Sequence, residues 1–376
     1  MRVLLLGNYR ADRQFSMLGF VGALQAGLPG LGLEVRAVAP RARIGRLRLP
    51  GASKWLAYAD KYLLFPPELR RAIRWADVVH VCDQGNAMYS RYLQGVPHIV
   101  TCHDMLAIRS ALGEIPAWRT GPAGRIYQSL ILSGIRRSRC AACVSSATQR
   151  DLLRIAPRSE SDARVVYNGL YRRLEPMPRA EASAILAGLG IMPDERYLLH
   201  VGGNQFYKNR NGVLQIYAAL RRLPEGAGVR LVMAGKPLTT DLRAAVSRQG
   251  LAPHVVEAAC VSDEQIRALL SRAQALLFPS LHEGFGLPIV EAQACGCPVF
   301  TSNRAPMTEV GGDAAVYFDP AKPEEAAALV AERIDCLSAM RAEGFENARR
   351  FSTERMLQGY AAAYDYALET QSRRAA

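Results

Sequence analysis

The chain of 376 residues is 49% hydrophobic and 22% charged, the balance of a globular protein long enough for two domains. Its apolar runs are shorter than the ~20 residues that span a bilayer, and its eight cysteines are dispersed, so neither a transmembrane protein nor a disulfide framework is expected. The net charge of +13 lies entirely in residues 1–160, with 23 Lys and Arg against 10 Asp and Glu, whereas residues 161–376 hold 24 of each.

The first half alternates short apolar strands with helices. Strands are predicted at Arg2–Leu6, Glu34–Ala39, Asp77–Cys82, His98–Cys102, Ala141–Ser145 and Arg164–Tyr167. Helices are predicted at Met17–Ala26, Ala87–Leu93 and Thr148–Ile155, and around Ser129–Ile135. This alternation is typical of a parallel sheet covered by helices on both faces. The first apolar run is short and soon followed by charge, so it indicates a buried strand rather than a secretory leader, and a cytoplasmic location is expected.

The second half restarts the same alternation. Strands are predicted at Tyr197–Val201, Val229–Met233, Val255–Ala258, Ala275–Phe278, Val299–Thr301 and Ala315–Phe318. Helices are predicted at Asn211–Leu220, Asp263–Ser271, Leu287–Cys295, Glu324–Leu337 and Arg355–Thr370. The two runs predict an α/β protein with two Rossmann-like domains, at 1–168 and 169–354. Such sheets bind ligands outside the carboxyl ends of their strands, and two facing domains would enclose a cleft for a nucleotide-bearing substrate.

The most informative segment is HEGFGLPIVEAQACG. Glu283 lies in the turn after a strand, and a glycine-rich stretch leads into a helix that has Pro288 in its first turn and Gly296 at its end. The glycines allow close approach of a ligand, and the helix N-terminus presents amides to an anion, which favours a diphosphate cradle. Glu283 and Glu291 could accept hydrogen bonds from sugar hydroxyls, although a Glu near a helix N-terminus often only complements the dipole.

Two further segments place polar groups at strand ends. In HVGGNQFYKN, Lys208 follows Gly203 by five residues and could neutralise a departing diphosphate. In TCHDM, His103 and Asp104 follow a strand, where a histidine could bond a sugar hydroxyl or act as a general base. A surface lysine and a structural histidine are the alternatives.

These segments together resemble glycosyltransferase family 4. The motifs that carry the resemblance are EGFGLPIVE, VYNGL, HVGGNQFYKN, VSSATQRDL and TCHDM. The resemblance implies the GT-B fold of two facing Rossmann-like domains, with a last helix, about 355–376, crossing back to the N-terminal, acceptor-side domain. It also implies transfer with retention of configuration and without a metal, from a UDP- or GDP-sugar to a glycan or lipid-linked acceptor, in bacterial envelope or exopolysaccharide assembly.

The resemblance also implies a role for each matching residue. Glu283 would contact the donor sugar, Lys208 the leaving diphosphate, and His103 the sugar near the reacting centre. Glu291 would hold the ribose. The remaining donor-binding residues implied are Gly203, Asn204, Arg210, Gly284, Phe285, Gly286 and Leu287.

Two departures from the family pattern stand out. Many members carry an Arg shortly after the glycine that precedes the lysine; here Asn204 follows Gly203, and Arg210 is a candidate replacement. Many members have a Gly-Gly pair after the first strand, where this chain reads Gly7-Asn8-Tyr9-Arg10. The second departure argues against the usual geometry of the acceptor-side loop, and with it against any inference of the acceptor from that loop.

The basic first half suggests an anionic partner. The densest run interleaves Arg41, Arg43, Arg46 and Arg48 with Ile44, Leu47 and Leu49. Such a run can dock at an anionic membrane surface, and a solvated Arg-rich loop is equally consistent with it. Rival functions are a sugar-nucleotide epimerase or phosphorylase of the same fold, or a non-catalytic nucleic-acid-binding protein, although no nucleic-acid recognition motif accompanies the charge.

Overall fold

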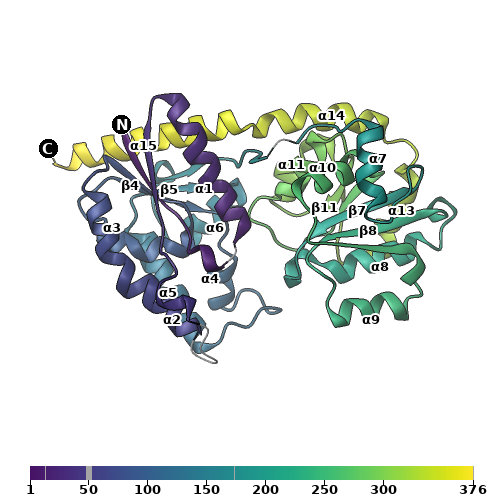
Figure 1. Cartoon of the computed structure of the whole chain (residues 1–376), viewed down its shortest axis with the longest axis horizontal. Helices are drawn as coiled ribbons and strands as arrows, with labels where there is room; N and C mark the ends of the chain where they lie inside the picture. Colours follow the sequence, from purple (N-terminus) through teal and green to yellow (C-terminus); the bar gives the residue numbers. More distant parts are fainter. Residues whose placement is uncertain (13, 48–52, 173, 376) are drawn as a thin grey trace. The chain divides into compact units, whose positions relative to one another are not determined.

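The chain folds into two compact α/β units (Figure 1). A computed structural model describes residues 1–12, 14–47, 53–172 and 174–375. The first unit comprises Met1–Tyr171 with Thr353–Ala376, and the second comprises Arg172–Ser352. Each contains one six-stranded parallel sheet, which confirms the expected fold class.

The first sheet has the strand order β2-β1-β3-β4-β5-β6, with every neighbouring pair parallel. Its strands are β1 (Arg2–Leu6), β2 (Glu34–Val38), β3 (Val78–Val81), β4 (His98–Cys102), β5 (Cys140–Cys143) and β6 (Ala163–Val165). The helices of this unit are α1 (Phe15–Gly27), α2 (Ser53–Ala59), α3 (Phe65–Ile73), α4 (Leu106–Ala111), α5 (Pro122–Arg137), α6 (Ser146–Ile155) and α15 (Thr353–Ala375). All of these strands except β2 and β6 are almost wholly buried, as the unbroken apolar runs predict.

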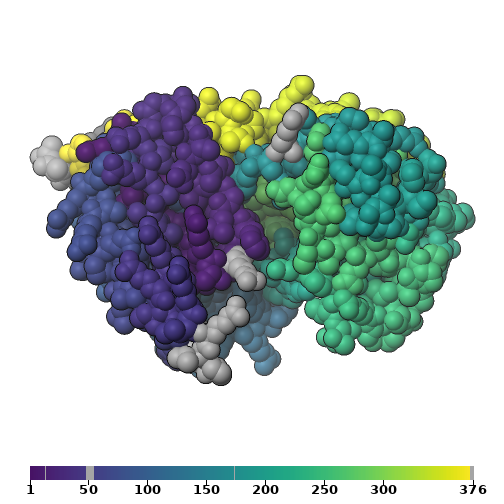
Figure 2. Space-filling view, in the orientation of Figure 1, coloured from purple at the N-terminus to yellow at the C-terminus, as the bar shows by residue number. Residues whose placement is uncertain are grey.

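The last helix belongs to the first unit. One face of the sheet packs against α1 and α15 through Phe20, Tyr360 and Tyr364, and the other face packs against α3, α5 and α6. In the space-filling view the yellow C-terminal helix lies against the purple N-terminal segments of this unit (Figure 2). Between sheet and helix, His80 on β3 bonds Tyr364 Oη at 2.9 Å and Thr101 Oγ1 at 2.7 Å. Complete burial lowers the pKa of His80 to about 3, so this histidine is a neutral part of the packing.

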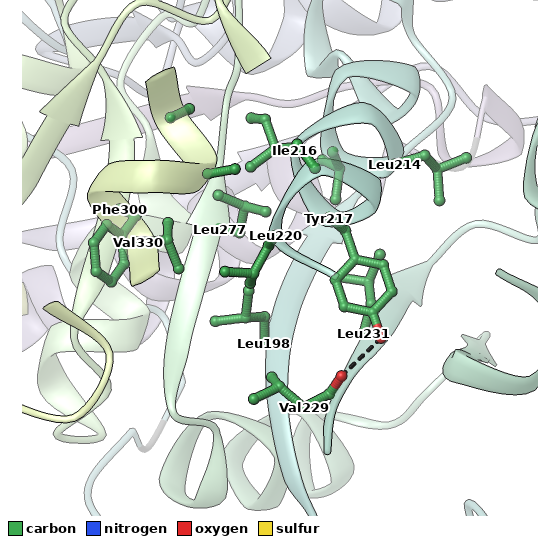
Figure 3. Packing of buried hydrophobic residues seen from close by; sticks show 14 of the residues in the cluster. Leu198, Leu214, Ile216, Tyr217, Leu220, Val229, Leu231, Leu277, Phe300 and Val330 are labelled. Carbon is green, nitrogen blue, oxygen red and sulfur yellow. Dashed lines mark hydrogen bonds between the residues drawn. The ribbon is translucent and has the colours of Figure 1, made fainter. Parts of the chain in front are cut away.

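The second sheet has the strand order β12-β11-β10-β7-β8-β9 and is again parallel throughout. Its strands are β7 (Arg196–Gly202), β8 (Val229–Gly235), β9 (Val255–Ala259), β10 (Ala275–Phe278), β11 (Val299–Ser302) and β12 (Val316–Phe318). Its helices are α7 (Arg179–Ala187), α8 (Arg210–Leu220), α9 (Thr240–Arg248), α10 (Asp263–Arg272), α11 (Leu287–Ala294), α12 (Met307–Gly311), α13 (Pro323–Arg333) and α14 (Ser338–Ala348). The core under α8 and α13 is mainly aliphatic, with Phe300, Phe318 and Tyr217 among its members. The Tyr217 hydroxyl donates to the Val229 carbonyl at 2.8 Å (Figure 3).

Two predicted helices differ in detail. The segment predicted as a helix at Ala87–Leu93 is a 3-10 helix over Gln84–Tyr92. Here α5 packs directly on the backbone, since a Cβ on Gly134 would lie 2.1 Å from the Ala87 carbonyl oxygen. The helix predicted to reach Leu337 ends at Arg333.

Candidate functional site

Two polar loops of the second unit, one after β7 and one after β10, flank the point where the strand order of its sheet reverses. From β7 the chain runs outward to β8 and β9 and then returns to β10, which lies beside β7 on the other side. Ligands of open α/β sheets bind at the carboxyl ends of the strands at such a switch point. The Leu281 amide donates to the Tyr207 carbonyl at 2.7 Å, and Asn209 Nδ2 donates to the Pro279 carbonyl at 3.0 Å, so the two loops are tied together.

Lys208 and Glu283 meet across these loops. Lys208 ends the 3-10 turn Phe206–Lys208, and Glu283 stands in the loop after β10. Lys208 Nζ lies 2.8 Å from Glu283 Oε1 and 2.9 Å from Oε2. The two side chains are only 18% and 9% exposed. The structure thus brings together two residues that lie 75 positions apart and that the sequence selected separately.

The loop after β10 ends at the N-terminus of α11. Gly286 precedes the helix with φ = +102°, a left-handed conformation that requires glycine, and Pro288 occupies the first turn. Gly286 has no side chain, so none caps this end of α11. Phe285 is buried against Phe351 at a centroid distance of 5.4 Å, which anchors the loop. A helix end of this kind attracts an anion.

Glu291 lies buried within α11, where Arg172 meets it. Arg172 Nη2 contacts Glu291 Oε1 at 2.9 Å, and Arg172 Nη1 also pairs with Asp263 at the start of α10. Burial raises the pKa of Glu291, and the charge of Arg172 opposes that rise. Sequence reasoning missed Arg172, because no local pattern distinguishes it from the other arginines near the join between the units.

Arg210 and Asn204 form a separate contact beside the Lys208 loop. Arg210 is buried, and its Nη1 donates to Asn204 Oδ1 at 2.6 Å and to the Lys236 carbonyl at 2.8 Å. Among the described residues, its Nε and Nη2 atoms have no hydrogen-bond partner. Burial lowers the pKa of this guanidinium. Arg210 therefore braces the loop that begins with Gly203 and Asn204, and two of its donor nitrogens are left for another group.

His103 belongs to the first unit, directly after β4. Its ring Nε2 lies 2.9 Å from the Cys82 carbonyl, and its backbone amide donates to Gln84 Oε1 at 2.8 Å. A carbonyl only accepts, so Nε2 carries the proton and Nδ1 is an acceptor in the neutral ring. Burial lowers the pKa of His103, although the nearby charge of Asp83 raises it. His103 can accordingly accept a hydrogen bond from a hydroxyl.

The carboxyl ends of β1 and β2 open into a cavity within the first unit. The cavity has a volume of about 660 Å³, and Asn8, Arg10, Arg41 and Arg46 are among the residues that line it. The loop that departs from the Gly-Gly pattern is anchored here, because Asn8 bonds Asp83 and Tyr9 Oη donates to Asp60 Oδ2 at 2.9 Å. The charged side chains in the lining are thus all basic.

The Arg-rich run is partly engaged within the unit. Arg41 and Arg43 contact Glu68 at 3.8 and 3.3 Å. Asp60 accepts from the amides of Arg43 and Ile44, which holds the turn in place. The predicted interaction residues Arg48 and Leu49 lie outside the described residues.

Two features are absent from the described part of the chain. No group of three His, Cys, Asp or Glu side chains there is arranged to hold a metal ion. None of the helices in that part is both long and apolar enough to cross a membrane.

Comparison with solved structures defines the class of fold. Anabaena Alr3699/HepE, solved with UDP and glucose, matches 97% of this chain and 100% of its own length with a TM-score of 0.74 at 18% identity. Sucrose-phosphate synthase from Thermosynechococcus elongatus matches with a TM-score of 0.75 at 16% identity, over 98% of this chain and 100% of its own. At these identities the likeness establishes the fold, which is GT-B.

Family models identify the chain further. The model for glycosyl transferases group 1 matches residues 183–351, and the model for Glycosyltransferase Family 4 matches residues 20–171. The chain therefore belongs to the family 4 glycosyltransferases, which confirms the resemblance. It is 33% identical over 165 residues to O-antigen chain mannosyltransferase B of Escherichia coli, a match covering 42% of each chain. It is 30% identical over 271 residues to the GDP-mannose:cellobiosyl-diphosphopolyprenol alpha-mannosyltransferase of Xanthomonas oryzae, covering 68% of this chain and 63% of the relative. The matches thus span less than two thirds of either relative's own length.

Proposed function

We propose that this protein transfers a sugar from a nucleoside-diphosphate sugar to a hydroxyl group of a glycan or lipid-linked acceptor, with retention of configuration. The observation that carries the proposal is the Lys208–Glu283 pair beside the uncapped N-terminus of α11. In this scheme the second unit binds the donor and the first unit binds the acceptor. The Xanthomonas relative is named for a GDP-mannose donor and a diphosphopolyprenol acceptor, and the Anabaena neighbour was solved with UDP.

The donor diphosphate would lie against α11. The amides at Gly286 and Leu287 and the ammonium of Lys208 supply positive charge to its oxygens, which supports transfer without a metal. Glu283 would release Lys208 and accept hydrogen bonds from the sugar hydroxyls. Glu291 would hold the ribose through its carboxylate, which Arg172 contacts at Oε1. Asn204 and Arg210 would shape the loop beside the phosphates.

The reaction would need no covalent enzyme intermediate. The bond from the sugar anomeric carbon to the diphosphate oxygen breaks as the acceptor oxygen approaches from the same face. The acceptor proton passes to the departing phosphate oxygen, whose charge Lys208 stabilises. His103 would accept a hydrogen bond from a sugar hydroxyl through Nδ1, which orients the ring.

Ligand-induced stabilisation tests the donor site. UDP, GDP and ADP are each added with EDTA, and unfolding is followed by differential scanning fluorimetry. A ligand at about one hundred times its dissociation constant stabilises the protein by ~2.7 kcal/mol. We expect one of the nucleotides to raise the melting temperature despite EDTA, and Lys208→Ala to lose most of that rise.

Lys322→Ala provides the matched control, because Lys322 forms an exposed ion pair with Glu325 in the same unit. It should respond to nucleotide like the wild type. No response to any nucleotide would overturn the donor assignment, and a response that EDTA abolishes would overturn the metal-free mechanism.

A further inference from the structure

Exposed large hydrophobic side chains gather on one part of the first unit. Among the described residues of the second unit, Met192 is the one large hydrophobic side chain that is exposed. Five of the others lie on α5 and on the segment from α2 to the start of α3: Trp55, Leu63, Leu64, Ile126 and Leu130. These helices lie side by side in Figure 1. We call the surface formed by these five residues together with Tyr58, Tyr62 and Tyr127 the tyrosine face.

Aromatic contacts join the two helical segments of this face. Trp55 packs edge-on against Tyr58 at 6.0 Å, and Tyr58 stacks on Tyr127 of α5 at 6.4 Å. The hydroxyls of Tyr62 and Tyr127 are 3.1 Å apart. These contacts join Trp55, Tyr58, Tyr62 and Tyr127 into one packed aromatic cluster within the tyrosine face.

A groove opens on the tyrosine face and is basic. It has a volume of about 480 Å³ and runs between α3, α5 and the 3-10 helix at Gln84–Tyr92. Its walls include Tyr62, Tyr127 and Leu130, and the charged side chains in its lining are Arg91 and Arg137, with no carboxylate among the lining residues. The guanidinium of Arg91 lies 4.8 Å from the centroid of the Tyr92 ring, which borders the same groove.

The chemistry of the tyrosine face matches the interface of an anionic bilayer. Tryptophan and tyrosine rings favour the headgroup level, leucine and isoleucine side chains enter the acyl boundary, and arginines bond lipid phosphates. The charge favours a bilayer over a protein partner, because the whole excess of +13 lies in residues 1–160 and the groove lacks the mixed charges of a typical protein rim.

We propose that the tyrosine face docks this protein on an anionic lipid bilayer. Trp55, Leu63 and Ile126 enter the boundary between headgroups and acyl chains, and Arg91 and Arg137 contact lipid phosphates. This surface differs from the Arg-rich run that the sequence singled out, where Glu68 partly neutralises Arg41 and Arg43. The proposal does not depend on the donor chemistry.

Vesicle flotation tests the proposal. The full chain is mixed with vesicles of phosphatidylcholine alone and with vesicles of phosphatidylcholine and phosphatidylglycerol in equal parts. We expect flotation with the anionic vesicles and weaker flotation at high salt. Arg91→Ser with Arg137→Ser should weaken binding about 30-fold, since each arginine near an anionic surface contributes about 1 kcal/mol.

Apolar variants test insertion. Trp55→Ser with Leu63→Ser should weaken binding at least about tenfold, because exposed apolar groups lose burial in the bilayer. The matched control is Met192→Ser, whose side chain in the second unit is 64% exposed and which should float like the wild type. All variants should keep the melting temperature and the nucleotide response of the wild type, which separates this test from that of the donor site.

Three results would overturn the proposal. The wild type could fail to float with anionic vesicles, or both pairs of variants could float as well as the wild type. The wild type could also fail to bind vesicles and instead form a dimer in solution, which Trp55→Ser with Leu63→Ser dissociates. The tyrosine face would then be a contact between two copies of the chain.

Discussion

Replacing Arg172 by methionine should destabilise the second unit in a way that depends on pH. The Glu291 side chain is 4% exposed, and Arg172, at 34% exposed, forms an ion pair with it at 2.9 Å. Breaking a fully buried pair by removing one partner costs about 3–5 kcal/mol. Water reaches part of Arg172, so we expect a loss of about 2–3 kcal/mol near neutral pH, or a fall in melting temperature of about 4–12 °C for a unit of this size.

The pH dependence follows from Glu291. Burial holds its folded pKa above the ordinary value of 4.5, and loss of Arg172 raises the folded pKa further. Below that ordinary value the carboxyl group is protonated in both the folded and the unfolded chain, so the deficit of the variant should shrink there and grow as the pH rises. Urea unfolding at about pH 7 and about pH 4 measures both values.

Two further variants complete the experiment. Arg172→Met combined with Glu291→Gln should recover most of the lost stability, because no buried charge is left unpaired. Arg196→Met removes an ion pair with Asp335 that is largely exposed, and should cost under about 1 kcal/mol. A deficit for Arg172→Met that is as large at low pH as at neutral pH would refute the reasoning.

Three other variants should give distinct results. Glu283→Gln frees Lys208 and removes a negative charge from the proposed diphosphate site. UDP or GDP should therefore bind about fivefold more tightly by calorimetry, while sugar transfer falls. Weaker nucleotide binding would contradict the assignment of the diphosphate site to this pair. Gly286→Ala should lower the free energy of unfolding by about 1–3 kcal/mol in chemical denaturation, because a φ of +102° strains any residue other than glycine. The control is Gly22→Ala within α1, where a Cβ meets nothing within 4 Å and no stability should be lost. The unfolding free energy of the first unit should fall as the pH drops from 6.5 towards 3, because the pKa of His80 is lowered to about 3 in the folded chain and the unfolded chain takes up the proton first. Hydrogen exchange measures this dependence, and His80→Gln should flatten it. An unchanged slope in that variant would contradict the role given to His80.

The parts of the fold that the sequence predicted are those that local chemistry determines. Unbroken apolar runs marked the central strands, and Gly286, Pro288 and Gly296 marked the limits of α11. The sequence selected Lys208 and Glu283 because each follows a strand, and the carboxyl ends of parallel strands share one edge of a sheet. Their role in binding a donor stays a prediction.

The parts that it did not predict depend on contacts between distant segments. Arg172 gains its contacts from Asp263 and Glu291, which lie about ninety and more than a hundred residues later, and nothing in its neighbours reveals them. The segment at Ala87–Leu93 has a helical composition, yet packing against Gly134 draws it into 3-10 turns. The tyrosine face was invisible for the same reason, because Trp55 and Tyr127 come from separate helices.

The position of α15 has a consequence for the order in which the protein matures during synthesis. The second unit is one continuous stretch, Arg172–Ser352, and its core can close as soon as that stretch has left the ribosome. The first unit is made earlier, but the sheet face that α1 covers in part is completed only when Tyr360 and Tyr364 arrive with the last helix. The N-terminal half must therefore wait for α15, and a premature stop codon ahead of Thr353 would damage the first unit and spare the second.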